Sequence, residues 1–127
     1  MRRVIIESPF MKSKNRSRAQ HIDYARRAVR DAISRGEAPI ASHLLLPQEG
    51  ILNDDVPEER TMGIEAGLAW MEVADASIFY TDCGWSSGML AALERCKRKE
   101  EYVYEFRSIF KSGFYSPWEE GLLINKE

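Results

Sequence analysis

The stretch ASIFYTDCGWSSGML, residues 76–90, decides the fold. Its first five residues are apolar and β-prone, as expected of a central strand. Asp82 and Gly84 favour a turn after this strand, and either Ser86 or Ser87 can cap a helix over residues 88–99. Such a unit places unpaired backbone N–H groups and the positive end of a helix dipole at the carboxyl edge of a sheet. The stretch therefore predicts an α/β fold that binds an anion such as a phosphate at this edge.

The rest of the chain alternates between short strands and helices. Apolar strands are predicted over residues 4–6, 38–42 and 102–106. The helix between the first two strands begins at a cap, Asn15 or Ser17, and ends near Gly36. Because helices separate successive strands, we expect right-handed crossovers and a mostly parallel sheet of four to five strands. This is a small Rossmann-like, three-layer α/β domain.

Apolar residues at helical spacing predict the buried faces of the three helices. In the first helix the face consists of Ile22, Ala25, Val29, Ala32 and Ile33. The second helix has Asp55 as its predicted cap and Pro57 in its first turn, and its predicted buried stripe is Met62, Ala66, Ala69, Trp70 and Val73. Gly63 and Gly67 in this helix permit the close approach of another element. In the third helix the stripe is Met89, Leu93 and Cys96.

Composition and charge bound the class of protein. The chain has 127 residues, 44% of them hydrophobic and 30% charged, with a net charge of −2. No apolar run approaches the roughly 20 residues of a membrane helix, and no secretory signal is expected. Residues 12–35 are basic and can attract nucleic acid, but without a nucleic-acid motif a solvated helix face is the preferred interpretation. We predict a single domain over residues 1–127 with its core at residues 3–106, and neither a membrane nor a nucleic-acid partner.

The two cysteines, Cys83 and Cys96, do not form a disulfide framework. Their positions, in the turn and in the following helix, predict reduced thiols and a cytoplasmic location. Neither has metal-ligand spacing with His21 or His43, so no metal site is expected. The sequence implies no cofactor.

The C-terminal tail, residues 107–127, is too apolar for a free solvated end. Its apolar residues include Phe110, Phe114, Tyr115, Trp118, Leu122, Leu123 and Ile124. The tail either packs on its own domain or covers a neighbouring subunit, which would give a homo-oligomer.

The element order over residues 3–106 resembles that of the nucleoside 2-deoxyribosyltransferase-like superfamily. The resemblance is specific only in Asp82–Met89, with weaker support from Glu7–Phe10. The superfamily includes transferases, nucleotide N-glycoside hydrolases and many bacterial and phage domains. The resemblance implies that a nucleoside is surrounded by the end of the first strand, the Asp-Gly turn and the start of the third predicted helix.

The resemblance also implies a catalytic glutamate, which this chain lacks. In such enzymes a glutamate just after the Gly-Met-like step attacks the anomeric carbon, and Leu90 occupies the matching place. An alkyl side chain cannot act as this nucleophile. The alternative catalytic candidates are Glu94, one helical turn further on, Glu7 and Asp82. Glu94 is otherwise a solvated surface acid, and the pair Glu58–Glu59 either activates a water or complements the helix dipole.

The ligand-binding candidates are Ser8, Phe10, His43, Asp82, Gly84, Trp85, Ser86, Ser87, Gly88 and Met89. The serines and Gly88 either cradle a phosphate or only cap the helix. Trp85 stacks on a base or packs against the tail, and His43 contacts a ligand or is structural. Arg60 pairs with a phosphate or forms an ion pair within its helix. Cys83, near a helix N-terminus, is expected to have a lowered pKa but has no histidine partner for thiol catalysis.

We therefore expect a protein that binds a nucleotide or an ADP-ribose-like derivative without turnover, as a sensor or a sequestering protein. The combination of the Asp-Gly-Ser-Gly turn with a lost carboxylate motivates this hypothesis. The alternative is an N-glycoside hydrolase or deoxyribosyltransferase that uses a relocated carboxylate.

Overall fold

The core of the fold is a sheet of four parallel strands in the order β2–β1–β3–β4. We describe residues 1–110 of a computed structural model. The strands are β1 (Arg3–Glu7), β2 (Ala38–Ile40), β3 (Ala76–Tyr80) and β4 (Val103–Arg107). The predicted parallel α/β sheet is confirmed. The tail predictions concern mainly residues 111–127, which lie outside the described residues.

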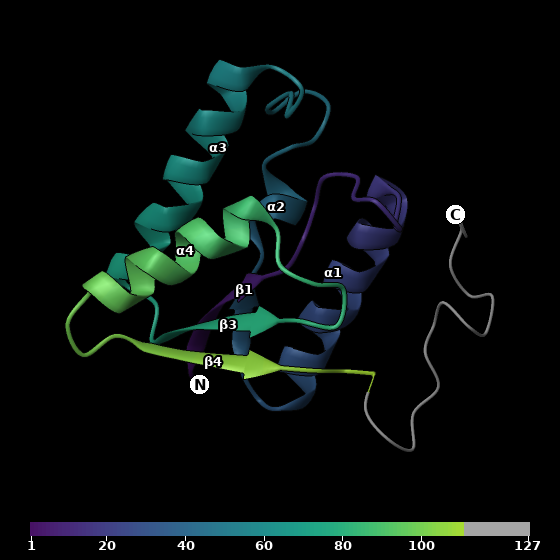
Figure 1. Cartoon of the computed structure of the whole chain (residues 1–127). Coiled ribbons are helices and arrows are strands. Elements are labelled where there is room, and N and C mark those ends of the chain that lie inside the picture. Colours follow the sequence, from purple (N-terminus) through teal and green to yellow (C-terminus); the bar gives the residue numbers. More distant parts are fainter. Residues whose placement is uncertain (111–127) are drawn as a thin grey trace.

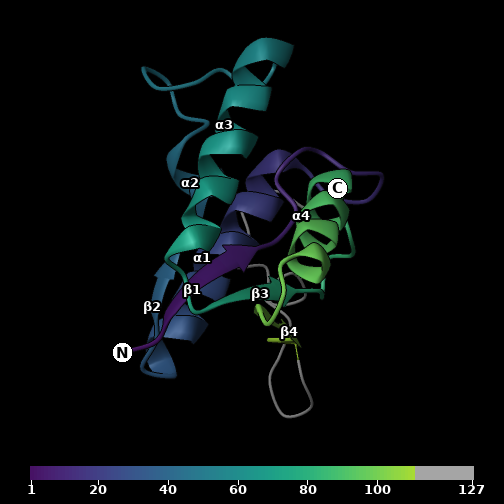
Figure 2. The same cartoon turned by 90° about the vertical axis from the view of Figure 1, so that its left-hand side faces the viewer.

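Helices cover both faces of the sheet and give three layers (Figures 1 and 2). Helix α1 (Arg18–Ser34) lies on one face, and α3 (Pro57–Ala69) and α4 (Ser87–Arg98) lie on the other. A short helix, α2 (Ser42–Leu45), follows β2, and a 3-10 turn, η1 (Trp70–Glu72), follows α3. The sequence did not predict α2.

Side chains alternate along the central strands and divide the core in two. Val4, Ile6, Ile78 and Tyr80 pack with α1. On the opposite face, Ile5 and Phe79 pack with η1 and α4. The central position of β3 explains why all five of its residues are buried.

Local sequence signals set the starts of two helices. The Ser17 side chain caps α1 in a capping box with Gln20, and Ser86 Oγ accepts a hydrogen bond from the Met89 N–H at 3.1 Å at the start of α4. The prediction of Asp55 as the cap of α3 is wrong. The cap position is Val56, without a side-chain hydrogen bond, and Asp55 instead accepts a hydrogen bond from Arg18 at 3.0 Å.

The predicted buried face of α3 is wrong. The only buried residue of this helix is Gly67, and a Cβ at this position would collide with Ser42 Oγ of α2. A Cβ at Gly63 would lie 3.3 Å from Leu52 Cδ1. The glycine face is turned inward, because at Gly67 only glycine permits the close approach of Ser42, and the predicted apolar stripe faces outward.

The predicted face of α1 is correct only in part. Ala25 and Ala32 are buried, but Ile33 is exposed. The other buried residues of α1 are Gln20, His21, Tyr24 and Ala28.

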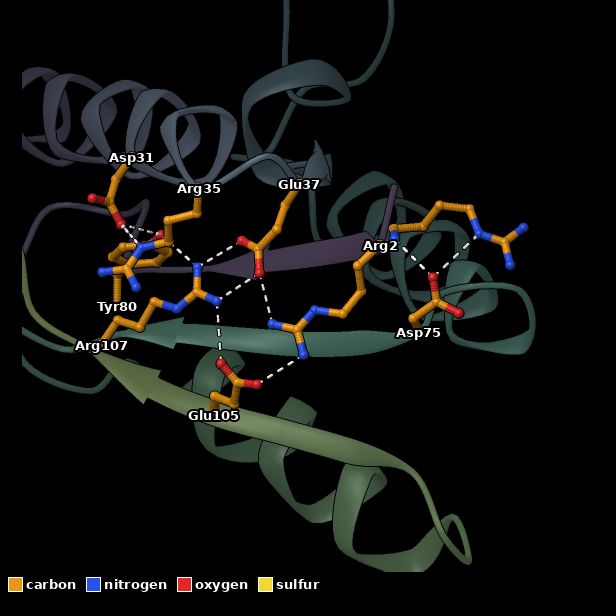
Figure 3. Close-up of polar contacts among 9 residues, drawn as sticks. Arg2, Asp31, Arg35, Glu37, Asp75, Tyr80, Glu105 and Arg107 are labelled. Carbon is orange, nitrogen blue, oxygen red and sulfur yellow. Dashed lines mark hydrogen bonds and ion pairs between the residues drawn. The ribbon is translucent and has the colours of Figure 1, made fainter.

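Four alternating charges join strand β4 to the segment before β2 (Figure 3). The Arg107 guanidinium donates two hydrogen bonds of 2.7 Å to Glu37, and Arg2 binds the same carboxylate at 2.6 Å. Glu105 accepts from both arginines, at 2.9 and 3.1 Å. Arg107 and Glu37 are buried, and the hydrogen bonds from Arg107 hold the pKa of Glu37 at about 2. The cluster covers the part of the sheet next to the edge strand β4, on the face where α1 lies (Figure 3).

Arg107→Ala should destabilise the protein strongly, because it leaves the buried Glu37 carboxylate with one arginine fewer. We expect a loss of about 3 kcal/mol in the free energy of unfolding, measured by urea denaturation. The matched control is Arg98→Ala, which removes an exposed pair 3.9 Å from Glu94 and should cost less than about 1 kcal/mol. Equal losses in the two variants would contradict the structural role of the cluster.

Candidate functional site

A cavity of about 360 Å³ lies at the carboxyl edge of the sheet. This volume falls within the range of about 300–1,000 Å³ typical of small-molecule sites. Its lining comes from the segment after β1, from α2 and the chain that follows it, from α3, and from the turn and first helical turns after β3. Polar lining residues include Glu7, Ser8, Ser42, His43, Ser86 and Ser87. Apolar lining residues include Phe10, Ile64, Leu68, Trp85 and Met89.

Glu7 contributes an unpartnered carboxyl group to this cavity. It is the last residue of β1 and pairs in register with Phe79, on the sheet face that α4 covers. Within the described residues, no hydrogen bond or ion pair engages its side chain. Burial raises the pKa of Glu7 to about 8. The carboxyl group is therefore mostly protonated at neutral pH and can both donate and accept a hydrogen bond.

Ser8 and His43 form a second polar group beside Glu7. Ser8 Oγ lies 2.7 Å from His43 Nε2. This contact joins the chain just after β1 to α2, which follows β2. Burial lowers the pKa of His43 to about 4, so the imidazole is neutral at physiological pH. The pair offers uncharged donors and acceptors to a ligand.

The start of α4 brings a helix N-terminus to the cavity. Ser86, Ser87 and Gly88 line the cavity, and Ser86 also caps the helix. A Cβ at Gly88 would meet only Ser86 Oγ, at 3.8 Å, so the chain is open on this side. The positive end of the α4 dipole therefore faces space that a ligand can occupy.

Trp85 and Phe10 line the cavity but already have ring contacts. Trp85 stacks on Phe79 with ring centroids 5.3 Å apart, and it meets Phe106 edge-on with ring centroids 5.4 Å apart. Trp85 is nevertheless 38% exposed, which leaves part of the indole available. The Arg18 guanidinium lies 5.2 Å from the centre of the Phe10 ring. Any contact of Trp85 with residues 111–127 lies outside the described residues.

Asp82 and Gly84 are the two ligand-binding candidates that the structure does not bring to the cavity. Asp82 accepts hydrogen bonds from the Tyr24 hydroxyl at 2.6 Å, from the Ser108 hydroxyl, and from the backbone N–H groups of Ile109 and Phe110 at 2.9 and 3.2 Å. Burial opposes ionisation, but these hydrogen bonds hold the pKa of Asp82 below its usual value. Gly84 makes the turn, with a φ of +87°.

The remaining catalytic candidates also lie away from the cavity. Glu94 is exposed and 3.9 Å from Arg98. Leu90 is exposed too, because α4 presents Met89, Ala91 and Ala92 to the cavity. Neither Glu58 nor Glu59 lines the cavity. Cys83 does line the cavity, but the expected low pKa is not found, since burial raises its pKa to about 12.

Helix α3 and the loop after β1 supply lining residues that the sequence did not identify as a group. From α3 these are Arg60, Gly63, Ile64, Gly67 and Leu68, and from the loop Met11, Lys12 and Ser13. The pair Gly63 and Gly67 was the available signal, because it marks the inner face of α3. Lys12 and Arg60 add cations to a lining whose Glu7 and His43 are largely uncharged. Arg60 Nε lies 4.0 Å from Asp54.

Residues 1–110 hold neither a metal-ligand cluster nor a membrane-spanning helix. No group of three or more His, Cys, Asp or Glu side chains in this part of the chain is placed to hold a metal ion. None of its helices has the length and apolar character needed to cross a membrane.

Comparison with known proteins gave one match. The sequence model of a family described as "Domain of unknown function (DUF7768)" matches residues 2–106. Neither the curated proteins nor the solved structures contained a match to the chain.

Glu7→Gln should change how stability depends on pH. The pKa of Glu7 is raised from 4.5 to about 8, so the folded state binds this proton more tightly than the unfolded state. This group therefore lowers the free energy of unfolding as pH rises from about 4.5 to about 8, and no further above that. Thermal unfolding across this range should give a flatter profile for Glu7→Gln and a higher Tm above pH 8. The exposed Glu94→Gln serves as the control, and a profile for Glu7→Gln with the wild-type slope would contradict the burial of the charge.

Proposed function

The chain belongs to the DUF7768 family, and we propose that it binds a nucleotide or a nucleotide-derived, ADP-ribose-like molecule at the carboxyl edge of its sheet. Binding occurs without turnover, as in a sensor or a sequestering protein. The observation that carries the proposal is the cavity with the unpartnered carboxyl group of Glu7 in its wall.

The chemistry of the lining matches the parts of such a ligand. Neutral Glu7 and the Ser8–His43 pair provide donors and acceptors for sugar hydroxyls and base edges without the cost of burying a charge. The exposed part of Trp85 offers a surface for base stacking. Lys12 and the N-terminus of α4 provide positive potential for a phosphate, whereas Arg60 lies 4.0 Å from Asp54, which also lines the cavity.

The resemblance to the nucleoside 2-deoxyribosyltransferase-like superfamily supports the same class of ligand. In those enzymes the nucleoside is surrounded by the end of the first strand and by the start of the helix after the Asp-Gly turn. Here the corresponding segments, the end of β1 and the start of α4, both line the cavity. The absence of a carboxylate on the cavity side of α4, a fully described helix, supports binding without a covalent step.

Two further parts of the proposal concern the setting of the protein. The two cysteines are free and buried, which supports a cytoplasmic location. The apolar sequence of the tail supports a homo-oligomer formed through residues 107–127.

A second candidate function is N-glycoside hydrolysis or deoxyribosyl transfer, with Glu7 as the relocated carboxylate. One observation favours it: a carboxyl group with a pKa of about 8 faces the cavity. A group with a pKa near the working pH is suited to general acid–base catalysis, here the activation of a water by the ionised form.

Gly88→Asp should abolish ligand binding, because it places a carboxylate in the cavity where the proposal places a phosphate. The measurement is mass spectrometry of the ligands retained from a panel of nucleosides, mononucleotides, dinucleotides, cyclic nucleotides and ADP-ribose. We expect at least a tenfold loss of affinity for the retained ligand. The matched control is Leu90→Asp, which adds the same charge near the start of α4 but on its exposed side. The proposed site is wrong if both variants retain the ligand equally well.

If the protein turns over its ligand, Glu7→Gln should lower kcat at least a hundredfold. After incubation with the same panel, the unbound fraction would then contain a released nucleobase, detected by mass spectrometry. The wild-type kcat/KM should rise with pH and level off above about 8, because the base form of Glu7 is required. Glu94→Gln is the control and should keep wild-type turnover. Release of the nucleobase that persists in Glu7→Gln would eliminate this second function.

A further inference from the structure

The carboxyl group of Glu7 lines the cavity at the end of β1 without a counter-ion. The other carboxylate among the described lining residues, Asp54, lies 4.0 Å from Arg60. Within the described residues, neither Lys12 nor Arg60, the two cations of the lining, forms an ion pair with Glu7. An ionised Glu7 is therefore a desolvated charge that no cation compensates, which is a costly arrangement. A proton on Glu7 removes this cost.

The titratable groups that face Glu7 from the sheet side are uncharged. They are Cys96 of α4 and Tyr102, which precedes β4. The Tyr102 hydroxyl lies 2.9 Å from Ser77 Oγ of β3 and therefore has a partner of its own. Burial, and to a smaller extent a charge on Glu7, raises the pKa of the Cys96 thiol and of the Tyr102 hydroxyl. Both groups remain protonated over the range in which Glu7 titrates.

Two further titratable groups share the cavity with Glu7, one from α2 and one from the turn after β3. Burial lowers the pKa of His43 to about 4 and raises the pKa of Cys83 to about 12. Both are uncharged near neutral pH. Because burial raises the pKa of Glu7 to about 8, Glu7 is the group of this set whose charge changes just above neutral pH.

We propose that Glu7 recognises the ligand as a neutral carboxylic acid, whose hydroxyl donates a hydrogen bond to the ligand while its carbonyl oxygen accepts another. This role rests on the proposed function, ligand binding at the carboxyl edge, and adds the group of the ligand that is recognised. That group is an uncharged edge with an acceptor beside a donor. A nucleotide offers such an edge at the amino group of adenine and at the ribose diol.

The ionised form of Glu7 cannot make both hydrogen bonds. A carboxylate only accepts, so the bond to the acceptor of the ligand is lost. A negative Glu7 also repels a ligand that carries a phosphate. In addition, a ligand that covers Glu7 excludes the water that would solvate the charge, so the complex holds the proton more tightly than the free protein does.

Affinity should therefore depend on pH through this one proton. It should be constant well below pH 8 and fall about tenfold for each pH unit above the pKa of free Glu7. The direction is opposite to that of the second candidate function, because turnover requires the ionised form and rises over the same range. The pH profile thus separates recognition by the acid from catalysis by the base.

The test is isothermal titration calorimetry of the full-length protein with AMP and with ADP-ribose. We expect the Kd to rise about tenfold between about pH 7 and about pH 9, and binding at about pH 8 to take up about half a proton per ligand. An equal Kd at both pH values overturns this role of Glu7 and leaves the proposed ligand binding intact. Absence of binding at every pH overturns both.

Two substitutions of Glu7 separate the neutral form from the charge. The Glu7→Gln amide keeps one donor and one acceptor and cannot ionise, so it should bind within about threefold of wild type at pH 7 and equally well at pH 9. Glu7→Leu removes both groups and should bind at least tenfold more weakly at either pH, with an unchanged circular dichroism spectrum. The control Glu94→Gln, an exposed site, should keep the wild-type profile. Loss of binding in Glu7→Gln at pH 7 means that the ligand needs the carboxylate, and the proposal fails.

Two analogues of AMP identify the edge that Glu7 contacts. Purine riboside monophosphate lacks the amino group of the base, and 2′,3′-dideoxy-AMP lacks the ribose diol. The analogue without the contacted group should bind wild type at least tenfold more weakly, and this difference from AMP should disappear in Glu7→Leu. If both analogues bind wild type as tightly as AMP does, Glu7 reads neither edge and the proposal is overturned.

Discussion

The carboxylate of Asp82 joins three segments that are far apart in the sequence. It receives hydrogen bonds from Tyr24 of α1 and from Ser108, Ile109 and Phe110 after β4, and it belongs to the turn after β3. The arrangement fixes the turn that leads into α4 and therefore the positions of Trp85 and Ser86. The carboxyl edge of the sheet depends on this one half-buried carboxylate and its four donors.

Asp82 and Glu7 show how the environment divides two acids of the same sheet edge into different roles. Asp82 is surrounded by donors, remains ionised and holds the structure together. Glu7 has no such donor in the described residues, and burial makes its neutral form dominant at physiological pH. The acid with satisfied hydrogen bonds is structural, whereas the acid with free hydrogen-bonding capacity faces the cavity. The cavity lining consequently combines neutral polar groups with apolar side chains, and its one other carboxylate in the described residues, Asp54, lies 4.0 Å from Arg60.

Local signals made much of this structure predictable from the sequence. The strand–helix alternation and the burial of Met89 and Cys96 follow from residue type and spacing alone, and for each of two helix caps the sequence left two candidates, of which the structure selects Ser17 and Ser86. The orientation of α3 did not follow, because its apolar stripe and its glycine pair favour opposite faces. Close packing against Ser42 decided between them, and this contact depends on α2, which the sequence did not reveal.

The residues of the candidate site could likewise be predicted only in part from the sequence. Residues next to strand ends, such as Ser8, His43 and Gly88, could be placed at the cavity from the topology, since parallel strands bring their carboxyl ends together. The role of Asp82 could not, because its donors arrive from β4 and α1 in three dimensions. The protonation of Glu7 also depends on burial by neighbouring elements, which no local pattern encodes.

The most direct test of ligand binding at the carboxyl edge is an NMR titration of ¹⁵N-labelled protein with AMP and with ADP-ribose. The indole N–H signal of Trp85 reports on the cavity, and that of Trp70 on the outer face of α3. The account predicts a saturable shift of the Trp85 signal with at least one of these probes and little change at Trp70. Saturable binding that moves Trp70 and leaves Trp85 unchanged, or no shift with either probe, would contradict it.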